Sequence, residues 1–215
     1  MDLIWLVGNF ALVCTVASNF TGIPICLGFF KNGSTSNISV VPFLAGVTCS
    51  SLWLMYGILL GDGTMKAVNS ICVLLQISYA ISYFINTYSK ERAQRLISIV
   101  AAFLLAVYAY GFHIADEPTA KITFGYLASL GSIAAFGSPL VSLGEVIRSK
   151  SSETLPFTVI FSSFIVGSSW FYYGILVENS FIQVPNLIGA ILSAIQLGLI
   201  AIYPSKKSKE YSKAD

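Results

Sequence analysis

Long apolar blocks separated by short polar loops dominate this sequence and restrict its fold more than any other feature. A transmembrane helix needs about 20 mostly apolar residues to cross about 30 Å of hydrocarbon. Seven blocks meet this requirement: Leu3–Phe30, Val40–Leu60, Met65–Tyr88, Leu96–Ala115, Ile122–Ile147, Leu155–Val177 and Phe181–Tyr203. They lack the polar stripe that a soluble amphipathic helix shows every 3.6 residues. The sequence therefore predicts an all-α membrane protein with seven transmembrane helices.

The composition excludes several classes of soluble protein. Of the 215 residues, 55% are hydrophobic and 10% are charged, and the mean hydropathy is +0.77. A soluble domain has about 25% charged residues, and one of this size could not bury so much apolar surface. The net charge of +2 provides no basic field for nucleic acid. A soluble enzyme, a disordered scaffold and a nucleic-acid binder are thus excluded.

The basic residues are sorted between the two sides of the predicted membrane domain. An odd number of spans places the termini on opposite sides. Of the twelve Lys and Arg residues, only Lys66 and Lys121 fall on the N-terminal side. The other ten are Lys31, Lys90, Arg92, Arg95, Arg148, Lys150, Lys206, Lys207, Lys209 and Lys213. This bias predicts a cytosolic C-terminus and an N-terminus that is outside or lumenal. We expect the plasma membrane, with the Golgi or another endomembrane as the alternative.

The cysteines and the single histidine give no sign of a disulfide or a metal centre. Cys14, Cys26, Cys49 and Cys72 all lie within the first three spans, and no CxxC pair occurs. One histidine, His113, is too few for a metal site built from His and Cys. We therefore expect no metal and no cofactor.

The most specific motif is an internal repeat with an offset of 117 residues. The segments starting at Trp53 and Trp170 share Trp, Tyr, Gly, Ile and Leu at identical spacing, and Asn69 and Asn186 follow at equal distances. Each repeat holds three spans, so both copies enter the membrane in the same sense, which is typical of transporters. The predicted parts are 1–89 (first three-helix repeat), 90–121 (linker helix and its loops), 122–203 (second repeat) and 204–215 (cytosolic tail).

On these residues the chain resembles the SWEET family of sugar facilitators over nearly all of its length. The resemblance is carried by the WxxYG-plus-Asn pattern in both halves, by Ser138-Pro139 with Ser151 beyond a basic segment, and by Leu155-Pro156-Phe157. The stretch from Leu52 to Gly63 looks more like animal members than plant ones. The resemblance implies two parallel three-helix bundles joined by a linker helix, and transport of a neutral, glucose-like sugar. The oligomeric state stays open, with a homo-oligomer among the options.

Two asparagines within apolar spans are the first candidate binding residues. A lone intramembrane asparagine commonly bonds to a neighbouring helix, but Asn69 and Asn186 occupy equivalent places in both repeats. A neutral amide offers both donors and an acceptor, which suits the hydroxyl groups of a sugar. The resemblance implies that this pair binds the substrate.

Trp53 and Trp170 are the second pair of candidates. Each lies roughly 10 Å from the outer end of its span at 1.5 Å per residue, which is deeper than an interfacial tryptophan. An indole face suits the C–H face of a pyranose ring, and the resemblance implies that Trp170 stacks on the sugar. Cys49 and Val166 lie one helical turn earlier on the same faces and are predicted to set the size of the pocket.

Prolines within spans or near their cytosolic ends are the candidate inner gate. Pro42, Pro139 and Pro156 lack a backbone N–H and are predicted to act as hinges. The resemblance implies a fourth proline, but Gly22 occupies the position equivalent to Pro139, with Pro24 nearby. A softened hinge is expected there.

The candidate outer gate lies one turn outward from the two tryptophans. It consists of Tyr56, Tyr173 and Asp62. The resemblance implies an acidic residue before the seventh span, where this chain has Asn179.

Passive transport of a neutral solute is favoured because no acidic or basic residue lies in the middle of a span. A seven-helix receptor would need neither the repeat nor such short loops. A related amino-acid exporter would have a Pro-Gln dipeptide at its hinges, which this chain lacks. An enzyme would need a paired nucleophile and base that the spans do not contain.

Overall fold

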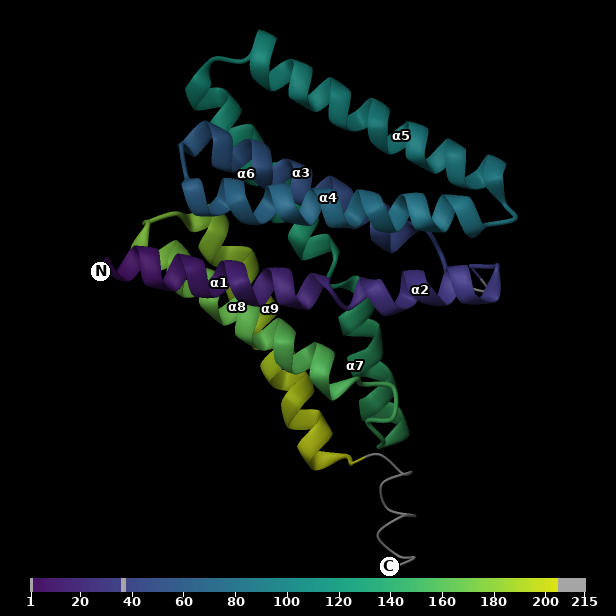
Figure 1. Ribbon diagram of the computed structural model, residues 1–215. Coiled ribbons are helices and arrows are strands. Elements are labelled where there is room, and N and C mark those ends of the chain that lie inside the picture. The colour runs from purple at the N-terminus through teal and green to yellow at the C-terminus, as the bar shows by residue number, and fades with distance from the viewer. Residues whose placement is uncertain (1, 36–37, 205–215) are drawn as a thin grey trace, which may run out of the picture. The chain divides into compact units, whose positions relative to one another are not determined.

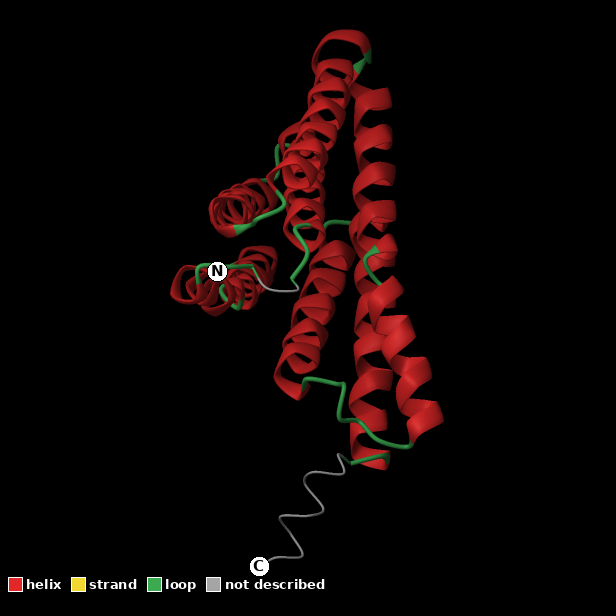
Figure 2. Cartoon of the chain, turned by 90° about the vertical axis from the view of Figure 1, so that its right-hand side faces the viewer, coloured by secondary structure: helices red, strands yellow, loops and turns green. Residues whose placement is uncertain are grey.

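The predicted spans form helices, and the structure confirms the all-α membrane class. A computed structural model describes residues 2–35 and 38–204. The elements are α1 (Leu3–Asn19), α2 (Gly22–Asn32), α3 (Val41–Leu60), α4 (Gly63–Asn86), α5 (Lys90–Ala109), the π-helical turn η1 (Tyr110–Ile114), α6 (Glu117–Ala134), α7 (Gly137–Ser149), α8 (Phe157–Leu176) and α9 (Ser180–Ile202). Over these residues, seven helical segments are long and apolar enough to cross a membrane, and Figure 2 shows helices joined by loops without strands. The predicted tail, with Lys206, Lys207, Lys209 and Lys213, lies outside the described residues.

The first span of each repeat is broken near its middle, close to the positions Gly22, Pro24 and Pro139 where the sequence analysis expected points of bending. The breaks fall between α1 and α2 and between α6 and α7. At the breaks the backbone forms tight bonds three residues apart, from Thr21 N–H to the Ser18 carbonyl and from Phe136 N–H to the Ile133 carbonyl. Pro24 or Pro139 follows as the third residue of the next helix. A proline N atom cannot continue the hydrogen-bond ladder of the preceding helix, so a new helix starts there.

The chain divides into two compact units that do not coincide with the two repeats. One unit comprises residues 15–128, and the other comprises the described residues of 1–14 and 129–215. The beginning of α1 therefore belongs to the unit that holds α7, α8 and α9. The beginning of α6 belongs to the unit that holds α2 to α5. Each first helix thus starts in one unit and continues into the other.

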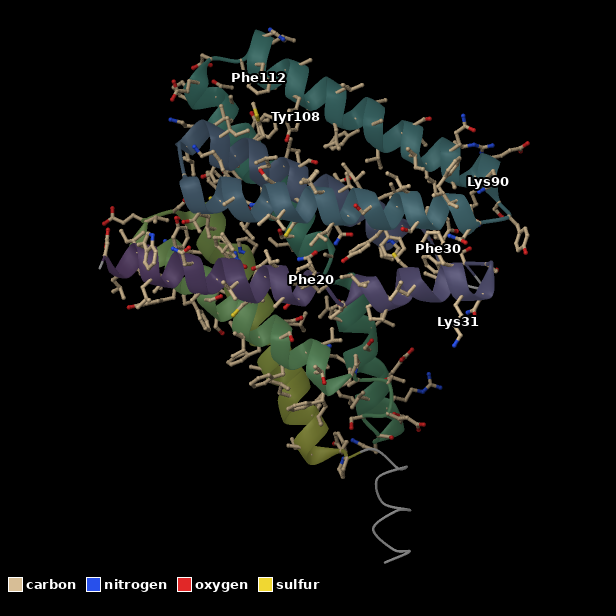
Figure 3. The ribbon with its side chains drawn as sticks, in the orientation of Figure 1. Phe20, Phe30, Lys31, Lys90, Tyr108 and Phe112 are labelled. Carbon is tan, nitrogen blue, oxygen red and sulfur yellow. The ribbon has the colours of Figure 1, made fainter. Side chains whose placement is uncertain are left out.

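In the unit of residues 15–128, α3 packs closely on α4 (Figure 1). An aromatic cluster joins α2 to both helices. The Phe29 ring meets the Phe43 and Tyr83 rings edge-on, with centroids 6.3 and 6.0 Å apart. Lys31 and Lys90 lie at the same end of this unit (Figure 3). Both were predicted on one side of the membrane, and this arrangement agrees with that prediction.

In the other unit, α8 packs on α9 over most of its length. Buried Val146, Leu155 and Ile160 form the core between α7 and α8. The Lys150 Nζ donates to the Tyr203 hydroxyl at 2.9 Å and lies 4.7 Å from the centre of the Tyr203 ring. These contacts join the ends of α7 and α9.

Turns at equivalent positions of the two repeats adopt the same backbone conformation. Gly61 ends α3 with a left-handed φ of 72°, and its equivalent Glu178 has φ 53°. The N–H groups of both donate to a carbonyl three residues earlier at 3.1 Å. Gly33 and Lys150 form a second equivalent pair, with φ 59° and 52°. Since only glycine adopts this conformation without steric cost, the second repeat carries strain that the first avoids.

We predict that Glu178→Gly stabilises the protein by roughly 0.5–1 kcal/mol, because glycine removes the left-handed strain. The apparent melting temperature of the purified protein in detergent should rise by about 1–4 °C. Gly61→Ala is the matched control and should lower the melting temperature. A Glu178→Gly protein that melts at or below the wild-type temperature would contradict the account of this turn.

Candidate functional site

The predicted tryptophan–tyrosine pairs adopt the same geometry in both repeats. On α3 the rings of Trp53 and Tyr56 meet edge-on, with centroids 5.8 Å apart. On α8 the rings of Trp170 and Tyr173 do the same at 5.4 Å. Both tyrosines are buried, Trp170 is 9% exposed, and Trp53 is half-buried. Each repeat therefore holds an aromatic pair of the same construction.

The two asparagines also match in detail. Asn69 on α4 donates from Nδ2 to the Met65 carbonyl at 2.9 Å, and Asn186 on α9 donates to the Ile182 carbonyl at 2.7 Å. Both are half-buried. Among the described residues, neither amide is hydrogen-bonded to a second helix. The predicted binding role of this pair stays a prediction at this point.

A capping residue fixes the start of the helix that bears each asparagine. The Asp62 carboxylate accepts from Met65 N–H at 2.9 Å and so caps α4. Its equivalent, Asn179, accepts through Oδ1 from the N–H groups of Phe181 and Ile182 at 3.1 and 3.3 Å and caps α9. The structure thus gives Asp62 a capping role, and its predicted part in an outer gate stays a prediction, as do those of Tyr56 and Tyr173. A side-chain acceptor is what this position requires, and Asp and Asn both supply one.

Two glycines allow the paired helices to approach closely just before these caps. A Cβ atom at Gly57 would lie 2.8 Å from the Met65 Cβ and 3.2 Å from the Lys66 N atom. At the equivalent Gly174 it would lie 3.0 Å from the Gln183 N atom. The glycine of the WxxYG motif is therefore the residue that sets α3 against α4 and α8 against α9.

The candidate gate prolines lie at the beginnings of helices. Pro42 occupies the first turn of α3, and Pro156 is the residue immediately before α8. Pro24 and Pro139 are third in α2 and α7. The N–H groups at such positions have no partner within the helix. These prolines therefore mark where helices begin, and their predicted role as hinges of an inner gate stays a prediction.

The remaining predicted residues differ in burial. Gly22 is buried, and a Cβ atom there would clash with the Tyr79 ring. Cys49 and Val166 are half-buried on α3 and α8. Pro139 and Pro156 line one cavity of about 250 Å³, to which the buried Gln196 also contributes. The structure therefore brings together two of the predicted gate residues within one unit.

Sequence reasoning missed a polar cluster at the break between α1 and α2. Asn19, the last residue of α1, accepts through Oδ1 from the Gln76 amide and through its carbonyl from the Tyr79 hydroxyl, both at 2.9 Å. Its own amide donates to the Thr15 carbonyl at 2.9 Å. The signal was three polar side chains in apolar spans, two of them one turn apart on α4.

Sequence reasoning also missed Pro185. It lies inside α9 and directly precedes Asn186. Its equivalent in the first repeat, Val68, retains a backbone N–H. A proline in the interior of a predicted span was the available signal.

The described residues contain no group of three His, Cys, Asp or Glu side chains that could hold a metal ion. The four cysteines are free thiols. The candidate site therefore consists of neutral amides and aromatic rings presented twice, once in each repeat. Two repeats with such equivalent residues in apolar helices are typical of a membrane transporter.

Comparison with known proteins places the chain within this class. The family model described as "Sugar efflux transporter for intercellular exchange" matches residues 5–93 and 122–208. The sugar transporter SWEET1 of Drosophila pseudoobscura is 36% identical over 94% of this chain and 90% of its own length. The bidirectional sugar transporter SWEET2a of Oryza sativa is 34% identical over 96% and 86%.

A solved structure agrees with the sequence matches. A eukaryotic SWEET transporter superposes with a TM-score of 0.87 at 27% identity, over 93% of this chain and 96% of its own. The chain therefore belongs to the SWEET family of sugar transporters, as the sequence motifs predicted. The two matched segments start 117 residues apart, which is the offset of the internal repeat.

We predict that Gly57→Ala and Gly174→Ala each destabilise the protein by about 1–3 kcal/mol, because the added methyl group overpacks a tight helix pair. Thermal unfolding in detergent measures this. Gly28→Ala and Gly144→Ala are matched controls in the same two units, since a Cβ atom there meets nothing within 4 Å. The controls should melt at or above the wild-type temperature. Equal melting temperatures for all four variants would show that close approach is not the reason for the motif glycine.

Proposed function

We propose that the protein carries a neutral, glucose-like sugar across a membrane in both directions. The observation that carries the proposal is the equivalence of Asn69 and Asn186 in position, burial and hydrogen bonding. In each, one amide N–H is used within the helix, so the other N–H and the carbonyl oxygen suit a sugar hydroxyl. The family, and the names of the relatives, support sugar as the substrate.

The aromatic pairs supply the apolar part of the same recognition. Trp170 is proposed to stack on the pyranose ring, with Trp53 as its repeat-equivalent partner. Its edge-on contact with Tyr173 holds the indole in place, which reduces the entropy lost on binding. Cys49 and Val166, small to medium and half-buried, are proposed to limit the size of the sugar.

Transport is proposed to be passive and to proceed by alternating access, in which the two membrane faces reach the sugar in turn. The acidic and basic residues of the sequence lie near the ends of the spans, so the path offers no ionisable group for coupling to protons. The helix breaks at Gly22 and Pro139 are the proposed points of bending, because fewer backbone hydrogen bonds cross them. Pro24, Pro42 and Pro156 are proposed to form the inner gate with them.

The N-terminus is proposed to face the outside or the lumen, and the C-terminus the cytosol. Ten of the twelve basic residues fall on the C-terminal side, which is the pattern of cytosolic loops. The plasma membrane is the proposed location.

We predict that Asn69→Ala and Asn186→Ala each reduce uptake of labelled glucose at least tenfold. Loss of a polar contact in a desolvated site costs about 1–3 kcal/mol, and 1.4 kcal/mol corresponds to a factor of ten. Uptake into cells or proteoliposomes measures this, with membrane insertion checked by the yield of folded protein.

Asn86→Ala provides the matched control. Asn86 also lies on α4 and donates to a carbonyl one turn earlier at 2.8 Å, but it is the last residue of that helix. This variant should transport sugar normally. Normal uptake by both Asn69→Ala and Asn186→Ala would place the binding site elsewhere.

A further inference from the structure

One hydrogen bond between α6 and α9 is explained by the proline inside α9. In an α-helix, the N–H of residue i donates to the carbonyl of residue i−4. Pro185 has no N–H, so the hydrogen bond that residue 185 would donate to the Phe181 carbonyl cannot form. The Ser129 hydroxyl on α6 donates to that same carbonyl at 2.8 Å. Ser129 therefore supplies the hydrogen bond that the proline removes.

This serine differs from others in the helices. The hydroxyls of Ser78, Ser82 and Ser163 donate to the carbonyl one turn earlier in their own helices. That bond is the usual way for a serine to satisfy itself in a helix. Ser129 instead bonds to another helix, and its side chain is buried with only 8% of its surface exposed.

The internal repeat provides a natural comparison. The residue equivalent to Pro185 is Val68, which keeps its N–H, and the residue equivalent to Ser129 is Leu12, which has no hydroxyl. The proline and the hydroxyl donor thus occur together in the second repeat and are both absent from the first. A bond that compensates for the proline is needed only where the proline is present.

The Phe181 carbonyl lies about one turn before Asn186, the proposed binding residue, in the same helix. Asn186 follows Pro185 directly, and its amide donates to the carbonyl of Ile182, the neighbour of Phe181. The same turn is tied to α8 by the Gln183 amide, which donates to the Gly174 carbonyl at 3.0 Å. The geometry of this turn therefore decides where the Asn186 side chain points.

We propose that Ser129 is a positioning residue for Asn186, which it orients by replacing the hydrogen bond lost at Pro185. The proposal rests on the proposed sugar-binding role of Asn186. Ser129 does not itself contact the sugar. It fixes the first turns of α9 so that the asparagine is held in its binding orientation before the sugar arrives.

The first test is a double-mutant cycle on stability. Ser129→Ala should lower the apparent melting temperature by about 1–4 °C, the range expected for one interhelical hydrogen bond in a membrane protein of this size. In a Pro185→Val background the valine N–H serves the Phe181 carbonyl, so Ser129→Ala should then have no effect. Pro185→Ala provides a second background with the same N–H. If Ser129→Ala lowers the melting temperature equally with and without Pro185, the proposed hydrogen-bond replacement is overturned.

The second test is on transport. Ser129→Ala should raise the KM for glucose about three- to tenfold, since a misoriented Asn186 weakens binding. Ser129→Thr retains the hydroxyl and should restore a near-normal KM. Ser78→Ala, which removes only a bond within one helix, should change neither the KM nor the melting temperature.

The outcomes separate the proposal from the function on which it rests. An unchanged KM in Ser129→Ala, with transport abolished in Asn186→Ala, would overturn the positioning role but leave the binding role intact. Normal transport by Asn186→Ala would contradict the binding role and the positioning role together. The proposal is supported if the KM rises in Ser129→Ala and returns to normal in Ser129→Thr, and if Ser129→Ala lowers the melting temperature only when Pro185 is present.

Discussion

In lipid, a backbone N–H or carbonyl without a partner has no water to bond with, and the rest of this structure depends on that constraint. Within a helix the backbone groups bond to one another, so the groups that need other partners lie where helices break or begin. At the break after α1, the Tyr79 hydroxyl serves the carbonyl of Asn19. At the starts of α4 and α9, Asp62 and Asn179 serve exposed N–H groups. Side chains thus supply the hydrogen bonds that the backbone cannot make at helix breaks and helix starts.

The two repeats meet this constraint with different residues in equivalent places. The first repeat fixes its broken span with polar groups, where Gln76 and Tyr79 bond to Asn19. In the second, Phe136 occupies the position equivalent to Asn19, and its ring covers Gly189 so closely that a Cβ atom there would lie 2.8 Å away. The motif residues Trp, Tyr, Gly and Asn stay the same, while the residues that support them differ. The aromatic and amide surface is therefore the shared feature, and its support is particular to each half.

The sequence predicted most of the fold because hydrophobic length and the repeat both carry strong signals. Seven apolar blocks indicated seven spans, and the matching Trp and Asn positions indicated two equivalent halves. Gly22 and Pro139 indicated points of bending in the first and fifth spans. Hydropathy did not show that each span divides into two helices there, because both flanking segments are apolar. Pro185 escaped prediction because its effect depends on Ser129, which lies 56 residues earlier in the sequence. Such pairings across helices become visible only when the hydrogen bonds of each carbonyl are followed in three dimensions.

The central proposal is that this chain, whose spans carry no acidic or basic residue in their middle, transports a neutral sugar passively. Purified protein in sealed proteoliposomes, supplied with labelled glucose, tests this most directly. The account predicts that internal glucose rises to the external concentration and stops there, at the same level with or without an imposed proton gradient. Accumulation above the external concentration when a proton gradient is present would contradict passive transport. Failure to take up any sugar from a panel of mono- and disaccharides would contradict the substrate class itself.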